Sequence, residues 1–240
     1  MSMRLIGPVY LIGGQDFNAV HLDWQANDAN VYLVDSGDTF VMIDCGCGES
    51  LPGILENVRR MEFDVGDISH LLLTHAHFPH AAAADDVQKM RIEVMASPPA
   101  AEAVLAGDLR TASFCYRHKF PPCEEELSVL KDGDTLEVGA IKLKAIALPG
   151  HSPGSMGYEL TVEGVRMLFC GDVVRGPALR ARRDRLDYDP GANVRSLSRL
   201  LEDPPDVLYP GHGPFCLSHG RAWIQEELRK ELEGPRAGPS

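Results

Sequence analysis

The stretch that decides the fold is Leu71-Leu72-Leu73-Thr74-His75-Ala76-His77-Phe78-Pro79-His80. Its first three residues are apolar and predict a short buried strand, so the histidines follow on the loop at the strand's end. Alternate residues of an extended segment share a face, so His75 and His77 can point the same way, and His80 follows as the chain turns. Residues 81–84 are all alanine, which favours the start of a helix.

This loop holds three of the nine histidines in the chain. Imidazole nitrogens that converge on one point suit Zn²⁺ or Fe²⁺. The alternative is a polar loop in which the histidines have no special role, and the density of histidines argues against it. The sequence therefore predicts a metal site at the end of this strand.

Composition narrows the functional classes. The chain has 240 residues, of which 44% are hydrophobic, and this suits a single α/β or two-sheet domain over residues 1–240. The net charge of −12 disfavours nucleic acid as a partner, because nucleic-acid binding needs a basic surface. No apolar run approaches the roughly 20 residues that cross a membrane, and no cleavable leader pattern is present. We therefore expect a cytoplasmic protein that binds no membrane; the oligomeric state stays open, a homodimer included.

The six cysteines are scattered along the chain. None forms a Cys-x-x-Cys pair, and the spacing of Cys45-Gly46-Cys47 is poor for a zinc ribbon. We interpret most of them as small buried residues in a reducing compartment.

Hydrophobic periodicity predicts the remaining elements. Strands are expected over 3–12, 31–34, 39–43, 92–95, 141–146, 156–162, 165–169 and 207–209, and helices over 50–61, 100–106, 190–201 and 219–232. Residues 107–125 have no clean period and mix aromatic, basic and proline residues. Such a segment is typical either of a lid that covers a site or of an ordinary surface excursion.

One pattern recurs at the strand ends. A short apolar strand runs into a loop that carries a ligand-type residue, and glycine lies beside several of these residues, which lets backbone and metal approach closely. The residues concerned are Asp44, His75, His77, His80, His151, Asp172 and His212. Each is a weak signal alone, but together they predict a cluster in space.

In this order the motifs resemble the metallo-β-lactamase superfamily, whose marks are a His-x-His-x-Asp-His loop, a later Gly-His, a Gly-Asp and a final Gly-His. The resemblance covers roughly residues 5–215. It implies an α+β fold, the four-layer αβ/βα sandwich, with two mixed sheets face to face and helices outside. It also implies a set of site residues: one metal at His75, His77 and His151, a second at His80 and His212 with Asp172 bridging, and Asp44 supporting the loop from behind the ligands.

Pro79 departs from the family pattern. It stands where the family has an aspartate that binds the second metal and orients the attacking water. Proline suits the first turn of a helix but offers no carboxylate. Three outcomes stay open: a one-ion site, a two-ion site completed by water or substrate, or loss of hydrolytic chemistry. Asp85 or Asp86 could substitute, although helical spacing does not favour either.

The first functional hypothesis is a metal-dependent hydrolase of a small ester, lactone or thioester, with Asp172 and Asp44 as its catalytic carboxylates. The resemblance implies one or two divalent ions, with Zn²⁺ as the first choice and Fe²⁺ or Mn²⁺ as alternatives. Water bound to such an ion has a pKa of about 7 and can therefore attack a carbonyl at neutral pH. A second hypothesis is a one-iron dioxygenase of the persulfide dioxygenase type, and a third is a degenerate, non-catalytic metal-binding member. The length resembles the small lactonase-type members more than glyoxalase II, which carries a C-terminal helical extension.

Two residues are candidates for contact with a small-molecule substrate. Arg175 follows Asp172 by three residues, a reach of about 10 Å when extended, and guanidinium binds carboxylate or phosphate as a paired fork. The sequence thus predicts an anionic substrate, against the alternative of a solvated basic loop. His118, within residues 107–125, is a candidate base, against the alternative of a solvated residue. Weaker steering charges are expected from Arg180, Arg182, Arg183 and Arg185.

Overall fold

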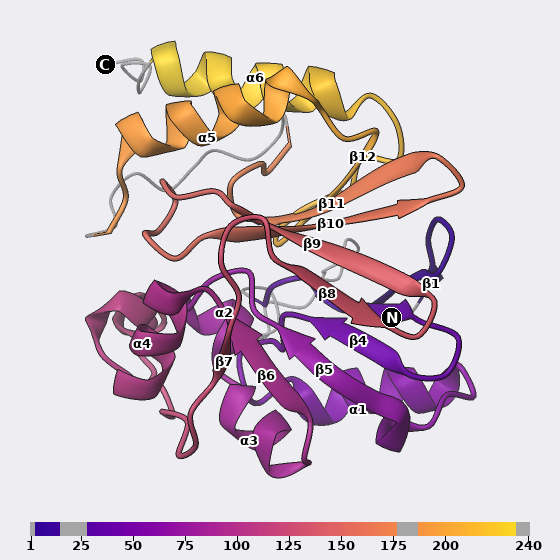
Figure 1. Ribbon diagram of the computed structural model, residues 1–240. Helices are drawn as coiled ribbons and strands as arrows, with labels where there is room; N and C mark the ends of the chain where they lie inside the picture. Colours follow the sequence, from indigo (N-terminus) through magenta and orange to yellow (C-terminus); the bar gives the residue numbers. More distant parts are fainter. Residues whose placement is uncertain (1–2, 15–27, 177–186, 234–240) are drawn as a thin grey trace, which may run out of the picture.

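The computed structural model describes residues 3–14, 28–176 and 187–233. Two β-sheets face each other across the middle of the molecule, and helices cover the outer face of each sheet (Figure 1). The layers therefore run helix, sheet, sheet, helix, which confirms the predicted four-layer αβ/βα sandwich.

The first sheet has seven strands in chain order. They are β1 (Met3–Arg4), β2 (Val9–Gly13), β3 (Val31–Asp35), β4 (Phe40–Ile43), β5 (Ile68–Leu72), β6 (Glu93–Ala96) and β7 (Ser128–Val129). Pairing is antiparallel from β1 to β4 and parallel from β4 to β7. The helices of this half are α1 (Leu51–Arg60), α2 (Phe78–Ala81), α3 (Ala84–Lys89) and α4 (Pro98–Ala106).

The second sheet has five strands in the order β12-β11-β10-β9-β8. They are β8 (Thr135–Val138), β9 (Ile141–Ala147), β10 (Met156–Val162), β11 (Val165–Gly171) and β12 (Val207–Pro210). Only β11 and β12 pair in parallel among these strands. Helices α5 (Pro190–Glu202) and α6 (Gly220–Glu233) cover its outer face (Figure 1). Within the described ranges, no helix is long and apolar enough to cross a membrane.

Both faces of the central strands are buried, which explains their continuous apolar sequence. On β3, Val31 and Leu33 join the apolar cluster beneath the helices, whereas Tyr32 and Val34 point toward the other sheet. The Tyr32 ring lies 5.4 Å from the ring of Phe169, which comes from β11. The period-two alternation of a strand thus divides its side chains between two separate cores.

Three predicted elements need correction. The strand expected over 3–12 is two strands, because the chain turns at Gly7 with φ +59°. The helix expected from Ala81 is two short helices. The first, α2, begins at Phe78, because Pro79 fits its first turn, and ends at Ala81, and α3 begins at Ala84. This places His80 on a helix rather than before one. The strand predicted over 71–73 is β5, which begins three residues earlier, at Ile68. The other predicted helices and strands are present, with their ends shifted by two residues or fewer.

Residues 107–125 contain two short 3-10 turns and lie against the histidine loop. The ring of Phe78 lies 5.6 Å from that of Tyr116 and 5.3 Å from that of His118, with both pairs stacked. His118 itself is exposed. The segment therefore contacts the predicted site through Phe78, and its role as a lid stays a prediction.

The cysteines are free thiols, mostly inside the fold. Burial raises the pKa of Cys47 to about 11 and that of Cys123 to about 12, so both stay protonated at neutral pH. Cys45, Cys170 and Cys216 are also buried, whereas Cys115 is exposed. Packing is therefore the main role of these side chains.

Phe169 tests the core between the two sheets. Phe169→Ala should remove about 3–5 kcal/mol from the free energy of unfolding, because its buried ring leaves a cavity. Urea denaturation followed by circular dichroism measures this loss. The control is Phe114→Ala, which removes a ring that is 47% exposed and should cost less than about 0.5 kcal/mol. Similar losses from the two variants would contradict this assignment of the core.

Candidate metal centre

The predicted ligand residues lie at one edge of the sandwich because of strand direction. β4 and β5 are parallel, as are β11 and β12, and β9 runs in the direction of β11 because β10 lies antiparallel between them. Within each sheet these strands therefore end at the same edge. The residues that follow them are Asp44, His75, His151, Asp172 and His212.

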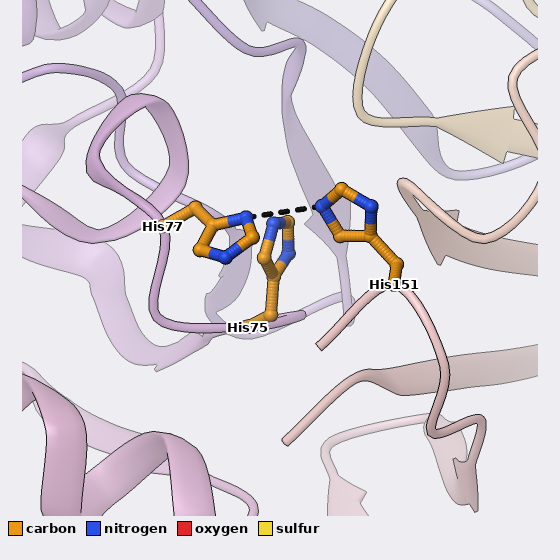
Figure 2. A group of neighbouring side chains, drawn as sticks. All are labelled: His75, His77 and His151. Atoms are coloured by element: carbon orange, nitrogen blue, oxygen red, sulfur yellow. Dashed lines mark hydrogen bonds between the residues drawn. The ribbon is translucent and has the colours of Figure 1, made fainter. Parts of the chain in front are cut away.

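Three histidines form the first cluster. His75, His77 and His151 are buried, and each offers a nitrogen atom within 4.8 Å of the others. The closest pair is His77 Nδ1 and His151 Nε2, which lie 3.0 Å apart. Figure 2 shows the three rings turned toward one another, with His75 and His77 on one loop and His151 on another. The fold thus brings together residues that are up to 76 positions apart in the sequence.

His75 also belongs to a second cluster, with His80 and Asp172. His80 Nε2 lies 3.4 Å from Asp172 Oδ1. His212 is outside both clusters, with its Nε2 3.6 Å from Asp172 Oδ2. The structure therefore places His212 beside Asp172, and its role as a ligand stays a prediction.

The chemistry of these residues fits a divalent metal ion. Among the described residues, the buried atoms His75 Nε2, His80 Nε2 and Asp172 Oδ1 lack a hydrogen bond of good geometry, and the last two meet only as an ion pair at 3.4 Å. Such an atom costs about 1–3 kcal/mol unless something satisfies it, and a cation does so. Burial, together with His80, His77 and His151, holds the pKa of His75 well below its ordinary value. His75 is therefore neutral and can donate a lone pair, as a metal ligand must.

Asp44 organises the histidine loop from behind the ligands. Its Oδ1 accepts a hydrogen bond from Thr74 N at 2.8 Å, and its Oδ2 accepts one from Thr74 Oγ1 at 2.8 Å. Asp44 Oδ2 also lies 2.8 Å from His80 Nδ1, which leaves His80 Nε2 facing the centre. This is the supporting position that the resemblance implies for Asp44.

The substitutes considered for the missing aspartate lie elsewhere. Asp85 Oδ2 accepts a hydrogen bond from Lys89 Nζ at 2.6 Å, and Asp85 Oδ1 accepts one from Glu124 N at 3.3 Å. Asp86 is exposed on α3. Neither carboxylate therefore replaces the one that Pro79 lacks.

Asp187 is a site residue that sequence reasoning missed. Its Oδ2 lies 2.9 Å from His77 Nε2, on the side of the ring away from His151. By engaging Nε2 it leaves His77 Nδ1 to face the cluster. The neighbouring sequence does not distinguish Asp187 from Asp189. Asp189 caps α5 by accepting a hydrogen bond from Ala192 N at 2.9 Å.

The loop that carries His212 is held by Asn30, just before β3, and by Tyr32 on β3, and the sequence analysis identified neither residue. Asn30 Nδ2 donates to the carbonyl oxygens of Pro210 and Gly213, both at 3.0 Å. Tyr32 Oη donates to the same Pro210 oxygen at 2.7 Å. Between them, Gly211 allows the close approach expected of glycine, because a Cβ there would lie 2.3 Å from His80 Cε1.

Arg175 lies beside Asp172. Its Nη2 forms an ion pair with Asp172 Oδ2, and the residue is 6% exposed. Burial alone would raise the pKa of Asp172, but Arg175, His212 and His80 hold that pKa well below its ordinary value. Contact of Arg175 with a substrate anion stays a prediction. Arg180, Arg182, Arg183 and Arg185 lie outside the described residues.

Comparison with known proteins identifies the family. The family model described as the metallo-beta-lactamase superfamily matches residues 24–212. The chain belongs to this superfamily. Solved members share the fold: a subclass B3 metallo-β-lactamase described as having an active-site glutamic acid is 27% identical, with a TM-score of 0.73 over 95% of this chain and 87% of that one. A subclass B3 enzyme of Bradyrhizobium japonicum, 19% identical, has a TM-score of 0.76 over 97% and 91% of the two chains, which shows the fold alone.

Curated members of the superfamily are longer than this chain. "Thioesterase pkgB" of Emericella nidulans is 30% identical over 196 residues, which are 81% of this chain and 48% of the relative. The "Beta-lactamase-like protein 2 homolog" of Caenorhabditis elegans is 25% identical over 213 residues, 85% of this chain and 63% of the relative. An "Atrochrysone carboxyl ACP thioesterase" of Aspergillus fumigatus is 25% identical over 213 residues, 87% and 56% of the two proteins. The chain thus spans about half to two thirds of the length of these relatives.

Asp44 tests the support of the histidine loop. Asp44→Ala should weaken the binding of a divalent metal ion, tested with Zn²⁺ as the probe, about 10- to 100-fold, because outer partners orient the ligands they touch. Competition with a chromophoric chelator measures the affinity. Asp64→Ala is the control, since it removes an exposed carboxylate that accepts a hydrogen bond from Gly66 N. Unchanged zinc affinity in Asp44→Ala would contradict the assignment.

His80 gives the metal-free protein a defined pH dependence. Burial lowers its pKa, but Asp44 and Asp172 outweigh burial and raise it to about 9 from the model-compound value of 6.5. A raised pKa contributes stability that is complete below about pH 6.5 and is lost as the pH rises through about 9. The difference in unfolding free energy between wild type and His80→Gln should therefore shrink by an amount on the order of 3 kcal/mol between pH 6 and pH 10. A difference independent of pH would refute this.

Proposed function

We propose that the chain is a metal-dependent hydrolase of a small acyl substrate, with thioesters first and esters and lactones as alternatives. The observation that carries the proposal is the convergence of His75, His77 and His151 on one buried point. The preference for thioesters is supported by two relatives whose names describe them as thioesterases. The proposal extends to this chain a chemistry that those names state only for the relatives.

His75, His77 and His151 would hold one divalent ion, and three imidazole ligands favour Zn²⁺ over Mn²⁺. When bound, the ion lowers the pKa of a coordinated water to about 7 and so supplies a nucleophile at neutral pH. Fe²⁺ is the alternative with similar ligand preferences.

The protein's own residues prepare this chemistry. Asp187 and Asp44 orient the rings of His77 and His80 through the nitrogens that face away from the centre. Asp172 stays anionic because its pKa is held low. Its Oδ1 can accept a hydrogen bond from the attacking water and orient it, whereas such a weak base does not retain the proton.

The test begins with metal analysis of protein purified without added metal. Hydrolysis is then followed on a panel of one acyl thioester, one aryl ester and one lactone, with the chelated protein and after zinc is restored. We expect thioester hydrolysis that disappears on chelation and returns with zinc. Iron content with O₂ consumption on glutathione persulfide would instead support the dioxygenase hypothesis, and a folded chain that binds no metal would support a degenerate member.

Substitution of His151 tests whether activity depends on the cluster of His75, His77 and His151. His151→Ala should lose at least about 100-fold in activity, because it removes a ligand of the ion that supplies the nucleophile. His70→Ala is the matched control, since His70 is partly buried on β5 and pairs with Glu93 at 3.6 Å, outside both clusters. Equal losses in the two variants would refute the assignment of the site.

Substitution of His118 distinguishes a role as catalytic base from a role in packing. His118→Ala should lower activity less than tenfold, because the exposed ring stacks on Phe78 and belongs to neither cluster. General-base catalysis typically contributes about 10²- to 10⁴-fold. A loss in that range, with an unchanged melting temperature, would make His118 the base.

A further inference from the structure

A guanidinium group lies in the wall of the metal centre. The Arg175 side chain is 7% exposed, and its Nη2 pairs with Oδ2 of Asp172, whose side chain is 1% exposed. The same oxygen faces His151 Nε2 at 3.4 Å and His212 Nε2 at 3.6 Å. Arg175 thus binds the carboxylate oxygen that lies between the two sides of the centre.

Helix α6 holds this part of the chain in place. Gly176 has φ +77°, and a Cβ there would lie 2.7 Å from Cζ3 of Trp223. Lys230 Nζ donates a hydrogen bond to Gly176 O at 2.8 Å and lies 3.3 Å from Glu227 Oε2. Burial raises the pKa of Glu227, whereas Lys230 and Arg175 oppose that rise, so the guanidinium also lies near a second buried carboxyl. Arg175 is therefore fixed between Asp172 and α6.

His75, His77 and His151 make one complete set of ligands. His75 Nδ1 lies 3.1 Å from Thr74 Oγ1, and His75 Nε2 is the nitrogen without a partner among the described residues. One nitrogen lone pair serves one ion, and the two three-residue clusters share His75. A second ion would therefore depend on His80, Asp172 and His212, and Arg175 already pairs with the Asp172 oxygen that faces His212. Pro79 supplies no carboxylate to make up the difference.

We propose that the guanidinium of Arg175 supplies the second positive charge of the centre, in place of a second metal ion, so that the chain holds one divalent ion. The charge of Asp172 is then neutralised by Arg175, and a second dication would be repelled by a buried cation at close range. This inference rests on the metal-dependent function proposed above but concerns the number of ions rather than the reaction. It gives Arg175 a structural partner in place of the predicted substrate anion.

The experiment counts zinc ions in four full-length chains: wild type, Arg175→Gln, Pro79→Asp, and the double variant. Metal-free protein is titrated with Zn²⁺ by calorimetry, and ions retained after desalting are counted by mass spectrometry. Wild type should retain one ion. Pro79→Asp restores the missing carboxylate, and adding Arg175→Gln to it should tighten the second zinc site at least tenfold further, giving two retained ions. A second-site affinity that is unchanged or weaker on adding Arg175→Gln would overturn the proposal.

Two further variants separate charge from packing. Arg175→Lys keeps a positive charge and, in the Pro79→Asp background, should leave second-site affinity within about threefold of Pro79→Asp alone. Arg166→Gln is the matched control, because it removes a partly buried arginine from the other end of β11, where it pairs with Glu159 and Asp203. It should leave the zinc count at one. If Arg175→Gln does not fold, a second tight ion in Arg175→Lys would still overturn the role of the charge.

The outcomes also distinguish this inference from the proposed function. Two zinc ions of equal affinity in wild type would overturn the one-ion centre and leave the hydrolase proposal intact. One zinc ion without hydrolysis of any acyl substrate would support the one-ion centre and contradict the hydrolase. A wild-type chain that binds no zinc, iron or manganese would overturn both.

Discussion

The centre depends on the burial of one carboxylate, that of Asp172. A buried anion is costly unless cations or hydrogen-bond donors surround it, and the fold meets this requirement from several directions. His80 faces one carboxylate oxygen, while Arg175, His151 and His212 face the other. His80 lies on α2 in the first half of the sandwich, whereas the other three residues follow β9, β11 and β12 in the second half. Compensation of this charge therefore links the two halves.

The two sheets are also joined directly beneath the histidine loop. Tyr158 Oη donates to Leu73 O at 2.8 Å, and Met156 N donates to Thr74 O at 2.8 Å, so β10 of the second sheet fixes the backbone just before His75. Asp44 then holds Thr74 and His80 from the side of the first sheet. A loop anchored from both sheets keeps its imidazoles in position before a ligand arrives, which reduces the cost of binding.

Pro79 changes this centre in two ways at once. It removes a carboxylate from the histidine loop, and it allows a helix to begin at Phe78, so that His80 lies in the first turn of α2. The buried carboxylates of Asp44 and Asp172 remain close to the histidines, Asp44 behind the loop and Asp172 within the second cluster. The net charge available to bind cations is therefore smaller, which agrees with a centre built around one ion and one arginine.

Local sequence predicted most of the strands and helices, whereas the resemblance to the superfamily supplied the order of the layers and the candidate ligands. Apolar runs with period two, helical spacing and turn residues act over a few positions, so the strands, the helices and the histidine loop could be predicted from neighbours alone. The absence of a carboxylate at position 79 could also be predicted, because the sequence alone shows Pro79 where the family motif has aspartate. The helix start at Phe78 was missed, since the run of alanines that follows is a stronger local signal than a single proline.

Only the tertiary structure shows which side chains pair with the candidate ligands and with Arg175. His77 and Asp187 are 110 positions apart, and no local pattern distinguishes Asp187 from other aspartates. The sequence placed Arg175 near Asp172, but only the tertiary structure shows that its guanidinium pairs with the buried Oδ2 of Asp172 while α6 packs against Gly176. The sharing of His75 between two clusters likewise appears only once the strand ends are assembled. Periodicity describes which face of an element is buried, whereas the pairing of charges depends on distances between elements that are remote in the sequence.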